Sequence, residues 1–250
     1  MKNKYPLILL TFSIILFSCK KKDDDNNNSV SDPTYGNLKI NIIGKHGGDD
    51  FVMYNEVVNS DNIAYRVEGL KFYVSNTKLD NESSSDVFLL NFVNNHLQPD
   101  SEGESFTVQI KTGSYSNLSF MIGLDSETNH GDPSLYPQND PLSSFNDTHW
   151  DWAQGYKFFI TDGKIDSDSD GTPDQSYSYH IGNDDYLKTV SLSANVAITE
   201  NNTTEVNIYF DVLKVIENID VNSESFTHST SNFPLVEKIA NNYAQAFSLN

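Results

Sequence analysis

The sequence predicts an all-β protein, an antiparallel β-sandwich that carries one C-terminal helix. Short segments in which apolar and polar residues alternate recur along most of the chain, and this period of two is typical of half-buried strands. Near the C-terminus, apolar residues recur at helical spacing instead. Many short strands followed by a single terminal helix favour a sandwich.

Charge and composition exclude some classes of protein. The chain has 250 residues, and its 16 Lys and Arg against 35 Asp and Glu give a formal charge of −19. Nucleic-acid binding needs clustered basic residues, so a nucleic-acid partner is not expected. Aromatic residues make up 12% of the chain, enough for a substantial core. No repeat of fixed period occurs, so residues 35–250 are expected to form one domain.

A targeting segment precedes that domain. Lys2 and Lys4 form a basic start, and residues 6–17 are almost wholly apolar, too short a run for the roughly 20 residues of a membrane span. The run ends in Leu-Phe-Ser before Cys19, the single cysteine, which resembles a bacterial lipobox. We therefore expect residues 1–18 to be a signal peptide and Cys19 to anchor the chain by lipid. This predicts an outer-membrane lipoprotein, displayed in the periplasm or at the cell surface.

Residues 19–34 are expected to be a disordered tether. They begin with a run of three lysines, three aspartates and three asparagines after the cysteine, which cannot bury apolar surface. Such a run after a lipid-bearing cysteine also resembles a signal for surface display. Removal of residues 1–18, which contain two lysines and no acidic residue, takes the formal charge from −19 to −21.

The predicted strands follow in order, separated by turn residues. They cover residues 38–42, 51–58, 65–79, 87–93, 106–110, 118–122, 155–161, 176–181, 190–198 and 206–215. Segment 176–181 is expected to form a hairpin with 155–161, and Asn201-Asn202 is a candidate hairpin turn. Residues 126–148 contain three prolines and little periodicity, and a loop of this length is either functional or mobile.

The predicted helix follows Pro234, a residue suited to the first turn of a helix. Its apolar residues are Leu235, Val236, Ile239, Tyr243 and Phe247. Their spacing places them on one face, which we expect to pack on the sheet or to close one end of the sandwich.

Five elements of the sequence, in order, resemble a known family. They are LKFYVSN with Leu79 (70–79), Gly113 to Asp125 with its FMIGLD, Pro141-Leu142 followed by WDWAQGYKF (150–158), YHIG (179–182) and IANNY with Phe247 (239–247). Together they resemble the MbnP-like family, named for a methanobactin-associated periplasmic copper protein, over residues 36–249. The resemblance implies an exported β-sandwich whose copper is held by two histidine nitrogens and by a tryptophan oxidised to kynurenine. The resemblance also implies a partner dihaem enzyme that makes this modification.

The resemblance also supplies candidate copper ligands. They are His46, His180, His228, Trp150 and Trp152. His180 matches the histidine of the fourth element, and His46 follows the first strand, so we expect these two to face each other at one end of the sandwich. At least one of the two tryptophans is expected only to pack in the core. Thr148 stands where relatives carry methionine, so no thioether ligand is expected there.

The remaining histidines, His96, His130 and His149, are expected to be solvated surface. Neutral imidazole suits copper, whereas the spacing of the histidines excludes a helical zinc-protease site. The lone lipobox cysteine excludes a catalytic thiol, and neither a GxSxG elbow nor a phosphate-binding P-loop occurs.

A second, separable cation site is suggested by an acidic run. Asp166, Asp168, Asp170, Gly171 and Asp174 fit the pattern D-x-D-x-D-G-x-x-D. Alternate carboxylates that converge on one cation, with a glycine at the sharp turn, are typical of calcium loops. Tyr177 stands at the twelfth position, where a calcium loop usually has glutamate. The two interpretations are a structural calcium at a hairpin tip and a solvated acidic turn.

The leading hypothesis is therefore a lipid-anchored copper-binding or copper-handling protein that is not itself an enzyme. The alternative is a surface adhesion or glycan-binding lipoprotein without copper, in which exposed aromatic residues and the acidic loop serve recognition. A hydrolase that uses pairs of carboxylates is a third hypothesis, although no carboxylate is set apart by its surroundings in the sequence.

Overall fold

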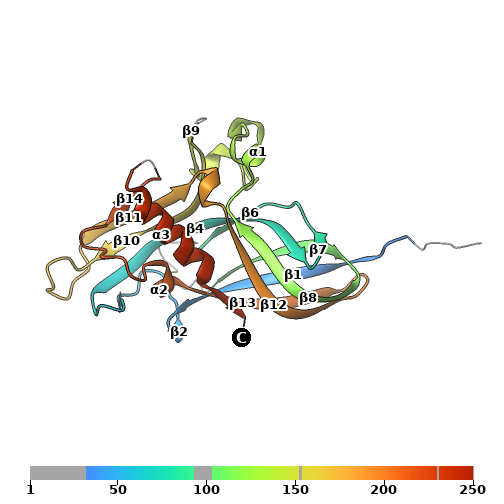
Figure 1. Ribbon diagram of the computed structural model, residues 1–250, viewed down its shortest axis with the longest axis horizontal. Coiled ribbons are helices and arrows are strands. Elements are labelled where there is room, and N and C mark those ends of the chain that lie inside the picture. Colours follow the sequence, from blue (N-terminus) through green and yellow to red (C-terminus); the bar gives the residue numbers. More distant parts are fainter. Residues whose placement is uncertain (1–31, 93–102, 152–153, 230, 250) are drawn as a thin grey trace, which may run out of the picture. The chain divides into compact units, whose positions relative to one another are not determined.

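The structure is a computed structural model that describes residues 32–92, 103–151, 154–229 and 231–249. Pro33–Asn250 form one compact unit built from two β-sheets and a C-terminal helix (Figure 1). In these ranges, no helix is both long enough and apolar enough to cross a membrane.

The two sheets differ in size. The smaller sheet contains β1 (Tyr35–His46), β2 (Asp49–Asp50), β7 (Gly103–Lys111), β13 (Thr203–Asp211) and β15 (Phe247–Leu249). The larger sheet contains β3 (Val57–Val58), β4 (Ala64–Leu79), β5 (Glu82–Ser83), β6 (Phe88–Asn91), β8 (Gly113–Ile122), β9 (His149–Asp151), β10 (Gly155–Ile165), β11 (Gln175–Gly182), β12 (Lys188–Ile198) and β14 (Phe226–Thr227).

Helical elements connect the strands. They are α1 (Ser126–Asn129), α2 (Val212–Val215), α3 (Phe233–Gln245) and the 3₁₀ turns η1 (Pro133–Leu135), η2 (Ser144–Asn146) and η3 (Asp184–Tyr186). The predicted β-sandwich with a C-terminal helix is confirmed.

Strand pairing follows the order β12-β8-β4-β10-β11-β14 in the larger sheet and β15-β13-β1-β2 in the smaller one, where β7 also pairs with β1. Most pairs are antiparallel, as predicted, and the predicted hairpin of β10 with β11 is present. Two pairs are parallel: β1 with β13, and β11 with β14. Each parallel pair joins segments that are far apart in the chain, so local patterns could not reveal it.

Three local predictions need correction. β12 and β13 do not form a hairpin, because β12 pairs with β8 in one sheet and β13 with β1 in the other. The turn at Asn201-Asn202 therefore leads from sheet to sheet. β13 ends at Asp211, whose carboxylate accepts a hydrogen bond from Leu213 N at 3.1 Å and so caps α2. Of the predicted strand 51–58, only Val57–Val58 are extended and paired.

The core lies between the sheets and is rich in aromatic rings. Phe72 of β4 is fully buried, and its ring centroid lies 5.8 Å from that of Phe159, 5.3 Å from that of Phe210 and 5.9 Å from that of Phe247. These partners come from both sheets. Because β4 and β10 each place alternate residues inward, the outward-facing residues of the same strands are left to form a second surface.

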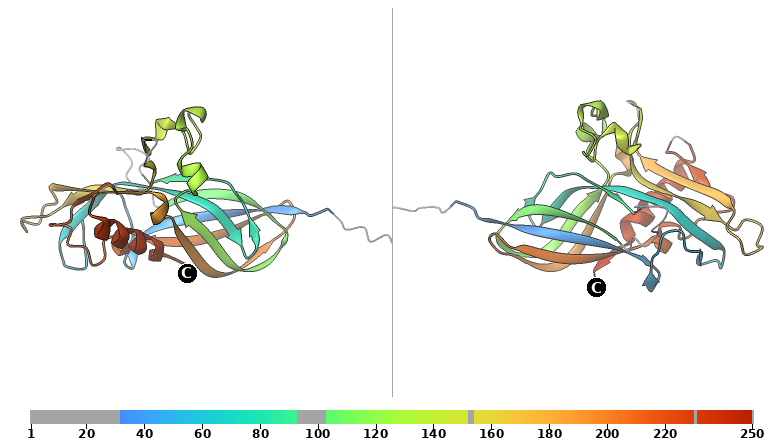
Figure 2. Two further views of the ribbon diagram at one scale, coloured as in Figure 1. Left: turned by 45° about the horizontal axis from the view of Figure 1, so that its top comes forward. Right: turned by 180° about the vertical axis from the view of Figure 1, so that it is seen from behind.

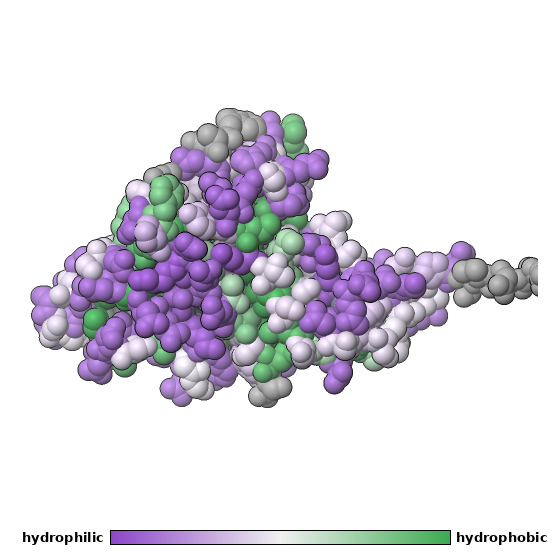
Figure 3. Space-filling view, viewed as in Figure 1, coloured by the Kyte–Doolittle hydropathy of each residue, from purple (hydrophilic) through white to green (hydrophobic). Residues whose placement is uncertain are grey.

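Helix α3 covers the part of the inner face formed by β10 and β11. Its buried residues include Val236, Ile239 and Tyr243, and the Tyr243 ring stacks on that of Phe159 at 4.8 Å. Polar residues gather over the outward side of this helix (Figure 3). The helix is thus amphipathic, as its sequence predicts.

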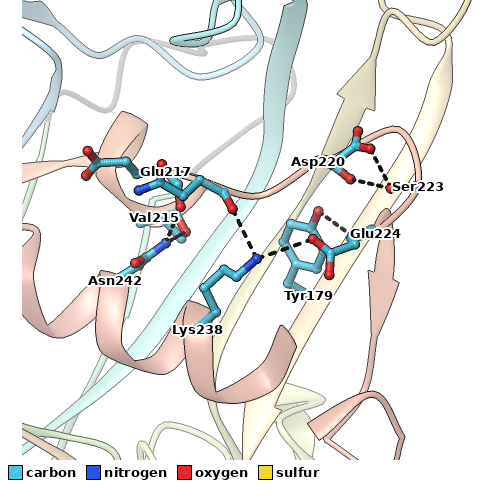
Figure 4. A network of polar contacts seen from close by, with 9 residues as sticks. Tyr179, Val215, Glu217, Asp220, Ser223, Glu224, Lys238 and Asn242 are labelled. Carbon is cyan, nitrogen blue, oxygen red and sulfur yellow. Dashed lines mark hydrogen bonds and ion pairs between the residues drawn. The ribbon is translucent and has the colours of Figure 1, made fainter. Parts of the chain in front are cut away.

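Polar contacts tie α3 to the segment that leads into β14 (Figure 4). Lys238 Nζ donates to the Asn218 carbonyl at 3.0 Å and lies 3.5 Å from Glu224 Oε2. The Tyr179 hydroxyl of β11 donates to the Glu224 carbonyl at 2.7 Å. The segment that precedes β14 is therefore fixed from both the helix and the sheet.

The long segment between β8 and β9 stands out from the outer face of the larger sheet (Figure 2). It covers a second, smaller core that contains Tyr73, Leu142, Tyr156 and Phe158. The Tyr156 hydroxyl donates to the Leu142 carbonyl at 2.6 Å, and the Tyr73 hydroxyl donates to the Pro141 carbonyl at 2.8 Å. This loop, predicted to be functional or mobile, is therefore anchored through its C-terminal half. It covers one side of the outer face.

Candidate metal centre

The uncovered part of this outer face is built by the hairpin of β10 and β11. In β11, Tyr177, Tyr179 and Ile181 point into the core, so the alternate residues Ser178 and His180 point outward. Register places Asp162 of β10 directly opposite Ser178. Asp162 and His180 are thus diagonal neighbours on one face, close enough for a long side chain to reach.

Strand β14 brings a second histidine to this face. It pairs in parallel with the edge of β11, with Ser178 opposite Phe226. His180 is two residues after Ser178, and His228 is two residues after Phe226. The same register therefore places His228, which directly follows β14, beside His180. Their rings are stacked, with centroids 4.2 Å apart and planes at 5°. The half-exposed ring of Phe226 also lies near His228, with ring centroids 4.2 Å apart.

One carboxylate and one hydroxyl organise the two imidazoles. His180 Nε2 lies 3.0 Å from Asp162 Oδ1 and 3.2 Å from Oδ2. Ser178 Oγ lies 3.3 Å from Nε2 of His180 and 3.3 Å from Nε2 of His228. His180 Nδ1 is buried and has no hydrogen-bond partner among the described residues. A buried ring nitrogen in this state is costly unless another group binds it.

Electrostatics favour an anionic Asp162 and a neutral His228. Burial by itself raises the pKa of Asp162. Hydrogen bonds with His180 and Ser178, together with the attraction of positive charge on the two histidines, outweigh burial, so the pKa lies below its ordinary value. Burial lowers the pKa of His228, and the neighbouring His180 and Lys157 lower it further, against the opposing effect of Asp162. His228 is therefore kept in the neutral form that a metal requires.

A tryptophan packs on the same face, over a residue two positions along β11 from His180. The ring of half-buried Trp150 covers Gly182, where an added Cβ would lie 2.7 Å from Trp150 Cζ3 and 2.3 Å from the Tyr156 carbonyl oxygen. Gly182 is two residues after His180, so its absent side chain would point to the same outer face. The glycine thus makes room for the indole beside the histidines. Trp152 lies outside the described residues, as do Cys19 and His96.

His46 lies elsewhere. Its ring contacts that of Tyr65, with centroids 5.8 Å apart, and Tyr65 belongs to the buried core on the inner side of the larger sheet. The expectation that His180 faces His46 is therefore wrong, because His180 points to the outer side and stacks on His228. His46 belongs to β1 of the smaller sheet and points between the sheets, whereas His180 lies on the outer face of the larger sheet.

The other predicted histidine environments differ from one another. His130 is exposed, with Nε2 3.4 Å from Asp184 Oδ2. His149 packs edge-on against Tyr156, with ring centroids 4.7 Å apart, so it is not simply solvated. Thr148, which replaces a methionine of the family pattern, is buried and hydrogen-bonded to the Tyr73 hydroxyl at 2.6 Å.

The residues present fit a copper ion. The lowered pKa of His228 favours its neutral ring, and Nδ1 of His180 is buried without a partner among the described residues. The two imidazoles therefore offer nitrogen donors, which copper accepts readily. The carboxylate at His180 Nε2 matches the outer partner that a metal-bound histidine usually has. Since the ring planes are parallel, at least one imidazole must turn before both can direct lone pairs to one ion.

Comparison with known proteins identifies the family. The family model MbnP matches residues 35–232. The chain belongs to the MbnP family. Among solved structures, MbnP from Methylosinus trichosporium is similar, with a TM-score of 0.58 and 14% identity over 82% of this chain and 87% of that chain. At this identity the likeness shows the fold alone. No curated protein matches the chain.

Sequence reasoning missed two residues of the site in this MbnP-family chain, Asp162 and Ser178. A signal was available for both. If the acidic run is the tip of a hairpin between 155–161 and 176–181, a symmetric register brings Asp162 close to Ser178. The prediction stopped the first strand at Thr161, whereas β10 continues to Ile165.

The acidic turn forms at the tip of the same hairpin. Oxygen atoms of Asp166, Asp168 and Asp170 lie within 4.8 Å of one another, while Asp174 is not part of this group. Asp166 is 6% exposed and accepts backbone N–H groups from Asp170 at 3.1 Å and from Gly171 at 2.9 Å. Gly171, with φ of 91°, supplies the turn that the pattern requires.

The lowered pKa of His228 gives a test in the metal-free protein. We expect His228 to titrate below the ordinary value of 6.5, because burial and His180 disfavour its charged form. The folded state then binds this proton less readily than the unfolded chain, so the free energy of unfolding falls as the pH drops below about 6.5. Histidine NMR titration measures this pKa directly. Asp162→Asn should lower it further, and a His228 that titrates above 6.5 would contradict the assignment.

Proposed function

We propose that this chain is an exported, lipid-anchored copper-binding protein, not an enzyme, that holds copper with His180 and His228. The observation that carries the proposal is the pair of imidazoles stacked at 4.2 Å beside Asp162, on an open sheet face. Neutral nitrogen donors are suited to copper, and oxygen-preferring cations are better served by the acidic turn.

Trp150 is the proposed third ligand, after oxidation to kynurenine by a partner dihaem enzyme. Its half-buried indole, beside Gly182 and on the same face as the histidines, supports this choice. Ring opening replaces an indole by a carbonyl and an aromatic amine, both of which have lone pairs for a metal. Mass spectrometry of protein from the native host distinguishes the modified side chain from tryptophan.

Membership of a periplasmic family supports export, and the proposed anchor is a lipid on Cys19. The proposed location is the outer membrane, with the domain in the periplasm or at the surface. Beyond the metal ion, the membrane and the dihaem enzyme, no further partner is proposed. An acidic chain with a formal charge of −19 remains a poor candidate for nucleic-acid binding.

The copper ligands are tested by single substitutions. His180→Ala and His228→Ala should each weaken copper binding by at least about tenfold, since even loss of an outer-shell partner costs roughly 10- to 100-fold in affinity. Competition against a chromophoric chelator measures the affinity. His130→Ala, which removes an exposed histidine, is the matched control and should bind as wild type.

Two results would count against this ligand set. Normal copper binding by His180→Ala would show that His180 is not a ligand. Loss of copper binding in His46→Ala alone would place the metal site on the core side of the sheet. A wild-type chain that takes up no copper would favour the alternative function, a surface adhesion or glycan-binding lipoprotein.

The proposal includes a structural calcium at the acidic turn, held by Asp166, Asp168 and Asp170. Their convergence within 4.8 Å and the glycine at the turn support it. Asp174, predicted as a fourth ligand, would have to move toward the group, and water or a carbonyl would complete the shell. Such an ion would fix the tip of the hairpin that carries Asp162 and His180.

Calcium should therefore stabilise the folded chain. A ligand present at about 100 times its Kd raises the free energy of unfolding by about 2.7 kcal/mol, which thermal unfolding with and without calcium measures as a higher Tm. Asp168→Asn should abolish the increase, whereas Asp185→Asn, an exposed carboxylate outside the turn, should retain it. An equal increase in both variants would indicate general screening of negative charge instead.

A further inference from the structure

His180 has two ring nitrogens in different surroundings. Nε2 lies 3.0 Å from Asp162 Oδ1, whereas Nδ1 is buried and has no hydrogen-bond partner in the described part of the chain. An ionised carboxylate has only acceptor atoms, so the hydrogen between Nε2 and Asp162 belongs to the nitrogen. In a neutral imidazole with Nε2–H, the lone pair is on Nδ1.

We propose that Asp162 is a positioning residue that fixes the Nε2–H tautomer of His180, so that Nδ1 is the atom that binds the metal. The inference rests on the proposed function of this site and specifies its donor atom. Asp162 itself does not bind the ion, because its oxygens are occupied on the Nε2 edge of the ring.

The fold places Asp162 for this task. It is opposite Ser178 in the hairpin and diagonal to His180, which is opposite Ile160. On its other side, Asp162 faces Gly69 of β4. A Cβ on Gly69 would lie 3.4 Å from both Cβ and Oδ2 of Asp162, an ordinary van der Waals contact. The glycine itself places no side chain beside the carboxylate.

Ser178 extends the same arrangement to the second ring. Its Oγ lies 3.3 Å from Nε2 of both His180 and His228. Both rings therefore turn their Nε2 edges toward the Asp162 and Ser178 side. Because Nε2 of His180 already contacts Asp162 and Ser178, Nδ1 is the ring nitrogen that is available to bind a metal ion. Leaving it unpaired in a buried position disfavours the metal-free state.

The first arm of the test needs no metal. In the metal-free wild-type protein, at a pH where the imidazole of His180 is neutral, nitrogen-15 NMR should report Nε2–H and a bare Nδ1 on this residue. Asp162→Asn should lose this preference, because an amide can donate as well as accept. Asp162→Glu, which keeps the carboxylate, should retain it. A wild-type His180 with Nδ1–H overturns the proposal.

The second arm measures copper affinity in the same variants. Asp162→Asn should bind copper about 10- to 100-fold more weakly, with Asp162→Glu closer to wild type, as expected for an outer-shell partner. Asp185→Asn is the control, and equal chemical unfolding midpoints show that the variants are folded. Unchanged affinity in Asp162→Asn overturns the positioning role alone. A wild-type chain without copper binding overturns the proposed function and the ligand role of Nδ1 together, whatever the tautomer.

Discussion

The short parallel pairing of β14 with β11 is the contact on which the candidate metal centre depends. Only Ser178 and Tyr179 of β11 pair with Phe226 and Thr227, yet this sets His228 beside His180. A two-residue strand is weak by itself, and neighbouring contacts fix it. Ser178 N donates to the Ser225 carbonyl at 2.8 Å, and Gly182 N donates to Ser229 Oγ at 3.0 Å.

The same pairing links the core to the open face. Thr227 is fully buried and donates from Oγ1 to the Ser231 carbonyl at 3.0 Å, while its neighbour His228 is directed outward. Helix α3 follows this segment and packs on the inner side of β10 and β11, and its Lys238 lies 3.5 Å from the Glu224 carboxylate. His180 is thus held within β11, and His228 directly follows the paired strand β14, which supports a site with defined donor geometry.

How much of this could be predicted depends on whether the signal is local. The alternation in β4 and β11 and the helical spacing of α3 are properties of neighbouring residues, so the fold class followed from them. The acidic turn is equally local. Sheet membership is not, because alternation shows that β12 and β13 are each half-buried but not which strands they join.

Prediction of the site depended both on local motifs and on long-range strand pairing. His180 and Trp150 were among the candidates because the MbnP-like motifs contain them, and His228 because it lies upstream of the motif in the closing helix. Their grouping without His46 could not be predicted, since β14 has two residues and no detectable period. Asp162 was missed because the extent of β10 decides which of its residues faces His180. Register is a long-range property, and one residue of slip would turn Asp162 into the core.

A crystal structure of protein isolated from its native host, with anomalous data collected at the copper edge, would locate the metal directly. We expect one copper ion on the outer face of β11, bound to Nδ1 of His180 and to His228, with a ring-opened side chain at position 150. Copper beside His46 and Tyr65, or an unmodified Trp150 with no metal near His180, would contradict it.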